Sequence, residues 1–113
     1  MRILGTLRAT KESEAGAPPD MDLMMRMGAF VEEAQKAGVL VGGDGLAPSA
    51  MGKRMKLQDG KLTVTDGPFT ESRELVASYA IFQVNDMDEA VHWTTRFLNV
   101  LGEGECELRQ IME

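Results

Sequence analysis

The spacing of apolar residues divides the first half of the chain into a strand, a helix and a second strand. Residues 2–9 have the composition of a strand. Over residues 21–37 the apolar positions recur at helical spacing, with Asp20 placed to cap the first turn and Gly38 to end the last. Residues 39–41 then predict a short second strand, which runs into a stretch rich in glycine.

In two segments of this half, the apolar residues follow neither the spacing of a helix nor the alternation of a strand. Residues 11–19 are polar and end in two prolines, which predicts a loop. Residues 42–46 contain three glycines, which indicate special backbone angles or the close approach of another group. Because this stretch lacks the lysine and hydroxyl ending of a phosphate loop, it reads either as a bulged strand end or as one wall of a cleft.

A β-hairpin is the clearest prediction for the middle of the chain. Asp59 and Gly60 stand between two strand-like runs, residues 54–58 and 61–66, and this dipeptide favours a two-residue turn. Such a turn fixes the register of the strands, and with it the face on which each side chain lies. The predicted cross-strand pairs are Leu57 with Leu62, Met55 with Val64, and Lys53 with Asp66.

The last third of the chain repeats the order of strand, helix and strand. Residues 76–84 predict a strand, and Asp86 with Glu89 forms a capping box for a helix that runs to about residue 100. Residues 105–112 alternate as a final strand. The whole order predicts an α+β fold of the ferredoxin-like type, a split βαβ arrangement with an inserted hairpin, an antiparallel sheet and two helices on one face.

The strand over residues 76–84 is apolar on both of its faces, and this predicts a homodimer. A strand that is buried on both sides needs a cover on each side. The two helices can cover only one face of a small sheet. We expect a second copy of the chain to cover the other face.

Length and charge narrow the classes of function. The 113 residues suffice for one domain over 1–113. The net charge of −6 and a pI of about 4.8 disfavour binding to nucleic acids or to an anionic membrane, and no apolar run reaches the ~20 residues of a membrane helix. We identify no signal peptide, and the single cysteine, Cys106, fits a reducing cytoplasm as a buried and inert thiol.

The sequence gives no reason to expect a metal or another cofactor. It lacks the histidine and cysteine spacing of a zinc site. His92 is the only histidine, and we expect it on the surface of the second long helix, paired with Asp88 one turn earlier. With one cysteine and one surface histidine, the sequence contains no Cys/His or Ser/His/Asp set for nucleophilic catalysis.

The densest group of polar side chains occupies residues 66–74, which begin with an Asp-Gly-Pro-Phe turn. Asp66 and Glu71 are the candidate catalytic groups, because paired carboxylates can act as acid and base. Arg73 is a candidate clamp for a substrate carboxylate. A structural reading stays open beside these roles, in which Asp66 only forms the turn or pairs with Lys53.

Two other segments contribute candidates to the same cleft. Asp44 comes from the glycine-rich stretch, and the charged loop over residues 8–16 is either a solvated connector or a flap that supplies a cation. Phe69 is a candidate apolar wall. The full set of candidate substrate-binding residues is Arg8, Lys11, Asp44, Asp66, Phe69 and Arg73.

Four blocks of the sequence, in order, resemble the DGPF branch of the YCII-related family: residues 8–16, 42–49, 66–74 and 104–112. The resemblance implies a ferredoxin-like domain that dimerises sheet face to sheet face, as in dimeric α+β barrels. Related barrels include isomerases and small monooxygenases with a cleft between the sheet and the helices. Ala47 stands where members often have histidine, so the resemblance does not carry a histidine-based mechanism to this chain.

Two functions are left open at this point. The first is a small dimeric protein that binds a small molecule in a cleft lined by the Asp-Gly-Pro-Phe turn, with or without weak acid–base activity of the isomerase or lyase kind. The second is a non-catalytic regulatory or interaction module. The resemblance implies an extracytoplasmic-function sigma factor as its partner, because DGPF proteins tend to be encoded beside such factors.

Overall fold

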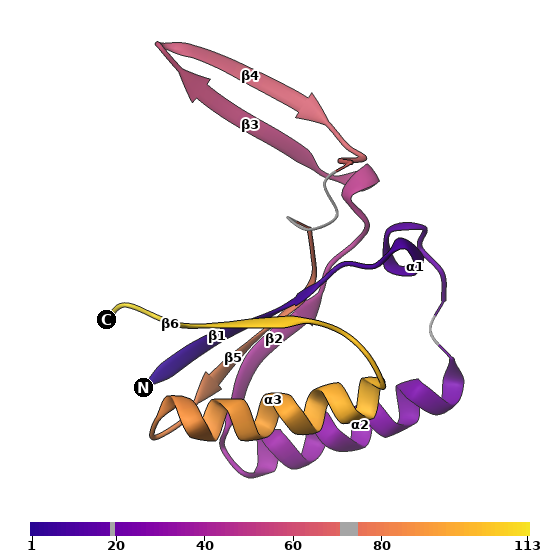
Figure 1. Ribbon diagram of the computed structural model, residues 1–113, viewed down its shortest axis with the longest axis vertical. Coiled ribbons are helices and arrows are strands. Elements are labelled where there is room, and N and C mark those ends of the chain that lie inside the picture. The colour runs from indigo at the N-terminus through magenta and orange to yellow at the C-terminus, as the bar shows by residue number, and fades with distance from the viewer. Residues whose placement is uncertain (19, 71–74) are drawn as a thin grey trace.

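A four-stranded antiparallel sheet with two long helices on one face forms the body of the protein (Figure 1). The computed structural model describes residues 1–18, 20–70 and 75–113. The strand order β2-β5-β1-β6 interleaves the two halves of the chain as a ferredoxin-like split βαβ fold does, which confirms the predicted fold class. The elements of the body are β1 (Arg2–Arg8), α2 (Met21–Lys36), β2 (Leu40–Gly45), β5 (Val76–Gln83), α3 (Met87–Leu101) and β6 (Cys106–Gln110).

The inserted hairpin forms a separate two-stranded sheet, and Figure 1 shows it standing away from the body. Its strands are β3 (Lys53–Gln58) and β4 (Lys61–Asp66). At the turn, Asp59 and Gly60 both have positive φ angles, 52° and 76°, as a two-residue turn of type I′ requires. Each cross-strand pair predicted from the sequence is confirmed.

The predicted loop over residues 11–19 is wrong at its start, where the chain forms a short helix, α1 (Lys11–Glu14). Thr10 caps this helix. Its hydroxyl accepts the N–H of Ser13 at 3.1 Å, and the Ser13 hydroxyl accepts the N–H of Thr10 at 2.8 Å. A single helical turn is too short to show apolar periodicity, so only this capping pair could have indicated it. A second short turn, η1 (Ser49–Met51), precedes the hairpin.

Strand β2 is longer than the predicted strand over residues 39–41, because it includes the glycine-rich stretch. Its pairing with β5 shifts by one residue between Leu40 and Gly42. Gly43 has a φ angle of 152°, and a Cβ atom there would lie 2.6 Å from the carbonyl oxygen of Tyr79. The glycine therefore allows the backbone of β2 to approach β5 closely.

The two long helices pack on one face of the sheet and on each other. Arg96 of α3 pairs with Glu33 of α2, and its guanidinium lies 4.9 Å from the centroid of the Trp93 ring. His92 lies on the surface as expected. Its ring meets Trp93 edge-on at 5.9 Å, and the salt bridges of the described residues do not include the expected pair with Asp88.

The hydrophobic core lies between the sheet and these helices. The core joins β1 to β5 and α3, so it depends on contacts between residues far apart in the sequence. Partly buried side chains such as Trp93 and Leu108 extend it. Its buried members are Ile3, Val39, Phe82, Val84 and Ala90.

The opposite face of the sheet is also apolar in part, and α2 and α3 leave it uncovered. Leu4, Tyr79 and Ile81 are half-buried there. This arrangement agrees with the pattern from which the sequence predicts a dimer. The dimer itself stays a prediction.

Candidate functional site

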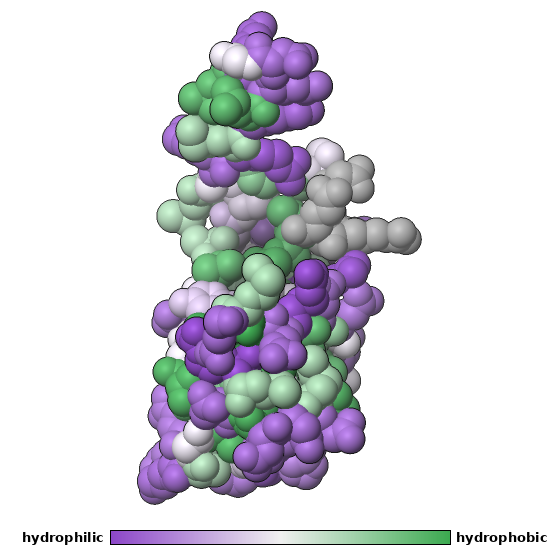
Figure 2. All heavy atoms as spheres, turned by 90° about the vertical axis from the view of Figure 1, so that its left-hand side faces the viewer, coloured by the Kyte–Doolittle hydropathy of each residue, from purple (hydrophilic) through white to green (hydrophobic). Residues whose placement is uncertain are grey.

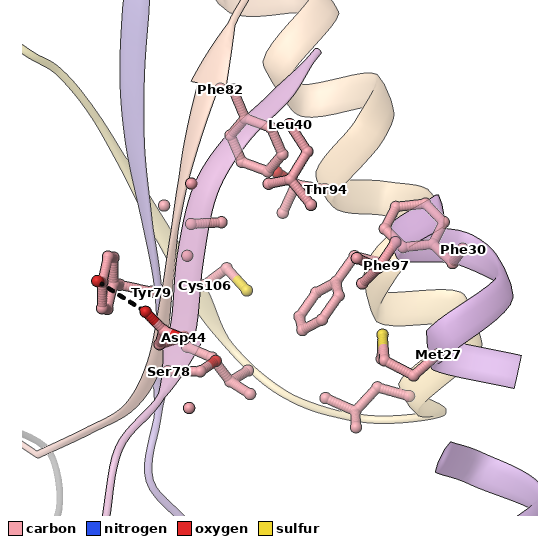
Figure 3. Close-up of a pocket in the computed structure, with 18 of the residues that line it drawn as sticks. Met27, Phe30, Leu40, Asp44, Ser78, Tyr79, Phe82, Thr94, Phe97 and Cys106 are labelled. Carbon is pink, nitrogen blue, oxygen red and sulfur yellow. Dashed lines mark hydrogen bonds between the residues drawn. The ribbon is translucent and has the colours of Figure 1, made fainter. Parts of the chain in front are cut away.

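A cavity of about 680 Å³ lies between the helix-facing side of the sheet and the two long helices (Figure 3). This volume is within the range of small-molecule sites in proteins. Apolar side chains from both layers make up most of the wall, as such sites usually show. The labelled examples are Met27 and Phe30 from α2, Phe97 from α3, Leu40 from β2, and Phe82 from β5.

Among the described residues, Thr94 of α3 is the one polar residue that is buried, and it lies in the wall of this cavity. It is only 8% exposed. Its Oγ1 atom has no hydrogen-bond partner in the part of the chain that the structure describes. A buried hydroxyl without a partner costs about 1–3 kcal/mol, so such a group calls for an explanation beyond packing.

Neutral polar groups from the sheet also line the cavity, among them the hydroxyl of Ser78 on β5 and the thiol of Cys106 on β6. Cys106 is half-buried. Burial raises the pKa of its thiol above the usual 9.0, because a thiolate would lose solvation there. The thiol is therefore protonated at neutral pH and is a weak nucleophile.

Asp44 is the charged residue among the described residues of the wall, but its carboxylate does not face the cavity. It accepts a hydrogen bond from the Tyr79 hydroxyl at 3.3 Å. Figure 3 shows the two side chains together on the side of the sheet away from the helices. The interior surface is thus neutral, which disfavours a charged ligand because no opposite charge would offset its desolvation.

The Asp-Gly-Pro-Phe turn, residues 66–69, lies at the base of the hairpin and adds nothing to the wall of this cavity. The Asp66 carboxylate lies 2.5 Å from the Lys53 ammonium group on the surface of the hairpin. The guanidinium of Arg54 lies 4.3 Å from the centroid of the Phe69 ring. In a single chain these contacts stabilise the base of the hairpin.

Ser49 fastens this turn to the rest of the chain. Its hydroxyl accepts the N–H of Phe69 at 3.1 Å. The carboxylate of Glu14 accepts that hydroxyl and also the Ser49 N–H, the latter at 2.9 Å, and these bonds lower the pKa of Glu14 from its usual 4.5. Gly67 is needed here because a Cβ atom would lie 1.7 Å from the Ser49 carbonyl oxygen.

The other candidates from the sequence lie elsewhere. Arg8 ends β1 and pairs with Glu105 at 2.6 Å, and Lys11 begins α1. Glu71 and Arg73 lie outside the described residues. The described candidates thus occupy four places, the hairpin base, the end of β1, the start of α1 and the outer face of the sheet.

Sequence reasoning passed over Thr94 because the residue belongs to the apolar stripe of α3 and reads as packing. A hydroxyl within such a stripe was the available signal. The described residues bring no three His, Cys, Asp or Glu side chains together in the manner of a metal site. No helix within them has the length and apolar character that crossing a membrane requires.

Comparisons with known proteins give a family and a fold. The family model of the YCII-related domain matches residues 1–113. No curated protein matches the sequence. A similar solved structure is 5-chloro-2-hydroxyhydroquinone dehydrochlorinase (TftG) from Burkholderia phenoliruptrix AC1100 in complex with 2,5-dihydroxybenzoquinone, with a TM-score of 0.58 and 13% identity over 100% of this chain and 95% of that chain. At this identity the similarity shows the fold alone.

Proposed function

The chain belongs to the YCII-related family, whose domain model matches residues 1–113, and from that premise we propose that its cavity binds an uncharged, mainly apolar small molecule. The observation that carries the proposal is the Thr94 hydroxyl, which is buried in the cavity wall and lacks a partner among the described residues. A ligand with one oxygen or nitrogen atom at this point would satisfy it.

The chemistry of the wall supports a ring compound with few polar atoms. Aromatic and thioether side chains such as Phe30, Phe97 and Met27 suit flat apolar groups. The hydroxyls of Ser78 and Thr94 can each donate to or accept from a carbonyl or hydroxyl group. A phenol, a quinol or an ester of comparable size has both features.

The structural neighbour supports this choice of ligand class by analogy. TftG is described in complex with 2,5-dihydroxybenzoquinone, a single ring that carries oxygen atoms. For the present chain, a ring of this kind is a proposal, and its ionised forms are disfavoured because the described wall of the cavity directs no charged side chain inward.

We favour binding without acid–base catalysis for a single copy. Among the described residues that face the cavity, Cys106 is the titratable one, and burial keeps its thiol protonated. The wall of the cavity does not include Asp66, so this residue has no catalytic role there in a single copy. Glu71, the other proposed acid or base, lies outside the described residues. A ligand-responsive regulatory module, with a sigma factor as partner, accords with binding alone.

We also propose that the protein is a homodimer whose two copies pair through the outer faces of their sheets. The half-buried side chains of Leu4, Tyr79 and Ile81 support this choice, because a partner would complete their burial. The cavity lies on the other side of the sheet, so this pairing leaves it open to a ligand.

Thermal denaturation with a matched pair of compounds tests the proposal. We expect neutral naphthol, at large excess over its dissociation constant, to raise the melting temperature by about 5 °C or more. Naphthoate has the same rings with a carboxylate and should raise it much less. The proposal fails if neither compound has an effect or if naphthoate is the better ligand.

Two adjacent threonines provide the matched variants. Thr94→Val removes the buried hydroxyl, whereas Thr95→Val removes an exposed one that donates to the Val91 carbonyl at 2.7 Å. We expect only Thr94→Val to weaken naphthol binding, by about tenfold for one lost hydrogen bond. Equal affinities for the two variants would show that Thr94 does not contact the ligand.

A further inference from the structure

The hairpin of β3 and β4 has an apolar face that the body does not bury. Met55, Leu57, Leu62 and Val64 occupy alternate positions on paired strands and therefore lie on one face. They are 50–72% exposed. Figure 2 shows hydrophobic side chains gathered on one side of the hairpin and hydrophilic ones on the other. A continuous patch of this kind marks an interaction surface.

The hairpin also lacks the support that two strands need in water. An isolated two-stranded hairpin is marginally stable at best. Here the base is fastened by Ser49 and Gly67, but Figure 1 shows the strands extending away from the sheet and helices. A partner that covers the apolar face would supply burial that the body does not provide.

We infer that the hairpin is an arm that lays its apolar face on the sheet of a second copy of this chain. The inference rests on the proposed pairing through the outer sheet faces and extends it. A groove of about 440 Å³ on that outer face can receive the arm. Its wall includes Leu4 of β1 and the C-terminal Ile111 and Met112, the last of which is 96% exposed.

Charge favours a second copy as the occupant. The arm is cationic overall, although the whole chain has a net charge of −6, so the body is more acidic than the chain as a whole. An arm of one copy and the body of another therefore have complementary charges. The cations of the arm are Lys53, Arg54, Lys56 and Lys61, and its anions are Asp59 and Asp66.

Symmetry explains why both apolar surfaces occur on one chain. In a two-fold dimer each copy contributes one arm and one groove, and both surfaces are covered at once. The exchange closes on itself, so it yields a dimer and leaves no unpaired arm from which a filament could grow.

Sedimentation equilibrium of the full chain tests the arm. In the variant Leu57→Thr/Leu62→Thr, two exposed apolar side chains are lost without any change in charge or in the buried core. We expect the dimer dissociation constant to rise by about tenfold or more. The control, Gln58→Thr/Thr63→Ser on the opposite face of the hairpin, should change it by less than about twofold. Equal constants for wild type and Leu57→Thr/Leu62→Thr would overturn the inference.

A contact measurement separates the arm from the pairing on which it rests. In a mixed dimer of methyl-labelled and unlabelled chains, isotope-filtered spectra should show contacts between chains from Leu57 and Leu62 to Ile111 or Met112. A dimer without these contacts would overturn the arm and leave the sheet pairing intact. A wild-type monomer would overturn both. The naphthol response of the cavity is a separate measurement in either case.

Discussion

The carboxylate of Glu14 accepts both the backbone N–H and the hydroxyl of Ser49, a residue 35 positions further along the chain. Ser49 in turn accepts the N–H of Phe69. One serine therefore joins the short helix α1, the turn η1 and the base of the hairpin. The most recognisable motif of the sequence, the Asp-Gly-Pro-Phe turn, owes its position to this joint.

Loss of the Ser49 hydroxyl should loosen that joint. In Ser49→Ala, the Phe69 N–H and one acceptor site on Glu14 lose their partner. We expect a loss of about 1–2 kcal/mol in the free energy of unfolding, because the bonds are partly buried. Urea denaturation measures it. The control Thr63→Ala, on an exposed strand of the hairpin, should stay within about 0.5 kcal/mol of wild type, and an equal loss in both variants would contradict the proposed role of Ser49.

Two glycines should respond to alanine in opposite ways. In Gly67→Ala, the new Cβ would overlap the Ser49 carbonyl oxygen, so the turn must move and the chain should be destabilised. In Gly28→Ala the new methyl group meets open space on helix α2, and stability should rise by about 0.5–1 kcal/mol. Hydrogen exchange at the Gly67 N–H, which donates to the Gly52 carbonyl at 3.0 Å, locates the change. If Gly67→Ala were as stable as wild type and the amide at position 67 stayed protected, this packing would be wrong.

Acid should weaken the fold through two carboxylates. Hydrogen bonds from Ser49 lower the pKa of Glu14, and a hydrogen bond from Arg96 lowers that of Glu33, each from the usual 4.5. A lowered pKa in the folded state stabilises the protein above pH 4.5, and this stabilisation is lost as the pH falls through the folded-state pKa. Glu33→Gln should therefore differ from wild type most near neutral pH and least in acid. A difference that grows as the pH falls would contradict this assignment.

Removal of the Thr94 hydroxyl should stabilise the ligand-free protein. Valine keeps the shape of threonine but has no polar atom to leave without a partner, so Thr94→Val should raise the free energy of unfolding by about 1 kcal/mol. Calorimetry of the ligand-free protein measures it. A residue that costs stability but improves ligand binding is typical of a functional site. Destabilisation by Thr94→Val would mean that the hydroxyl has a structural partner.

Local sequence rules were sufficient where local interactions decide the structure. The turn at Asp59 and Gly60 fixes the register of the hairpin, so each predicted pair follows from two residues. The caps at Asp20 and Asp86 likewise mark the starts of α2 and α3. Short α1 escaped detection because one helical turn shows no periodicity.

The site depends on contacts that local rules do not reach. The partner that positions Phe69 is Ser49, 20 residues away, and the partner that constrains Gly43 is the backbone of the neighbouring strand. Asp44 was a reasonable candidate by type, but strand alternation directs its carboxylate to the outer face. Thr94 matters only because the cavity lies in front of it, and no periodicity predicts a cavity.

The rate at which iodoacetamide labels Cys106 tests the central claim most directly, because this thiol lines the cavity that we propose as the ligand site. Naphthol at tenfold excess over its dissociation constant should slow the labelling by about tenfold. The same concentration of naphthoate should have little effect. An unchanged labelling rate under conditions where naphthol raises the melting temperature would place the ligand elsewhere and contradict the account.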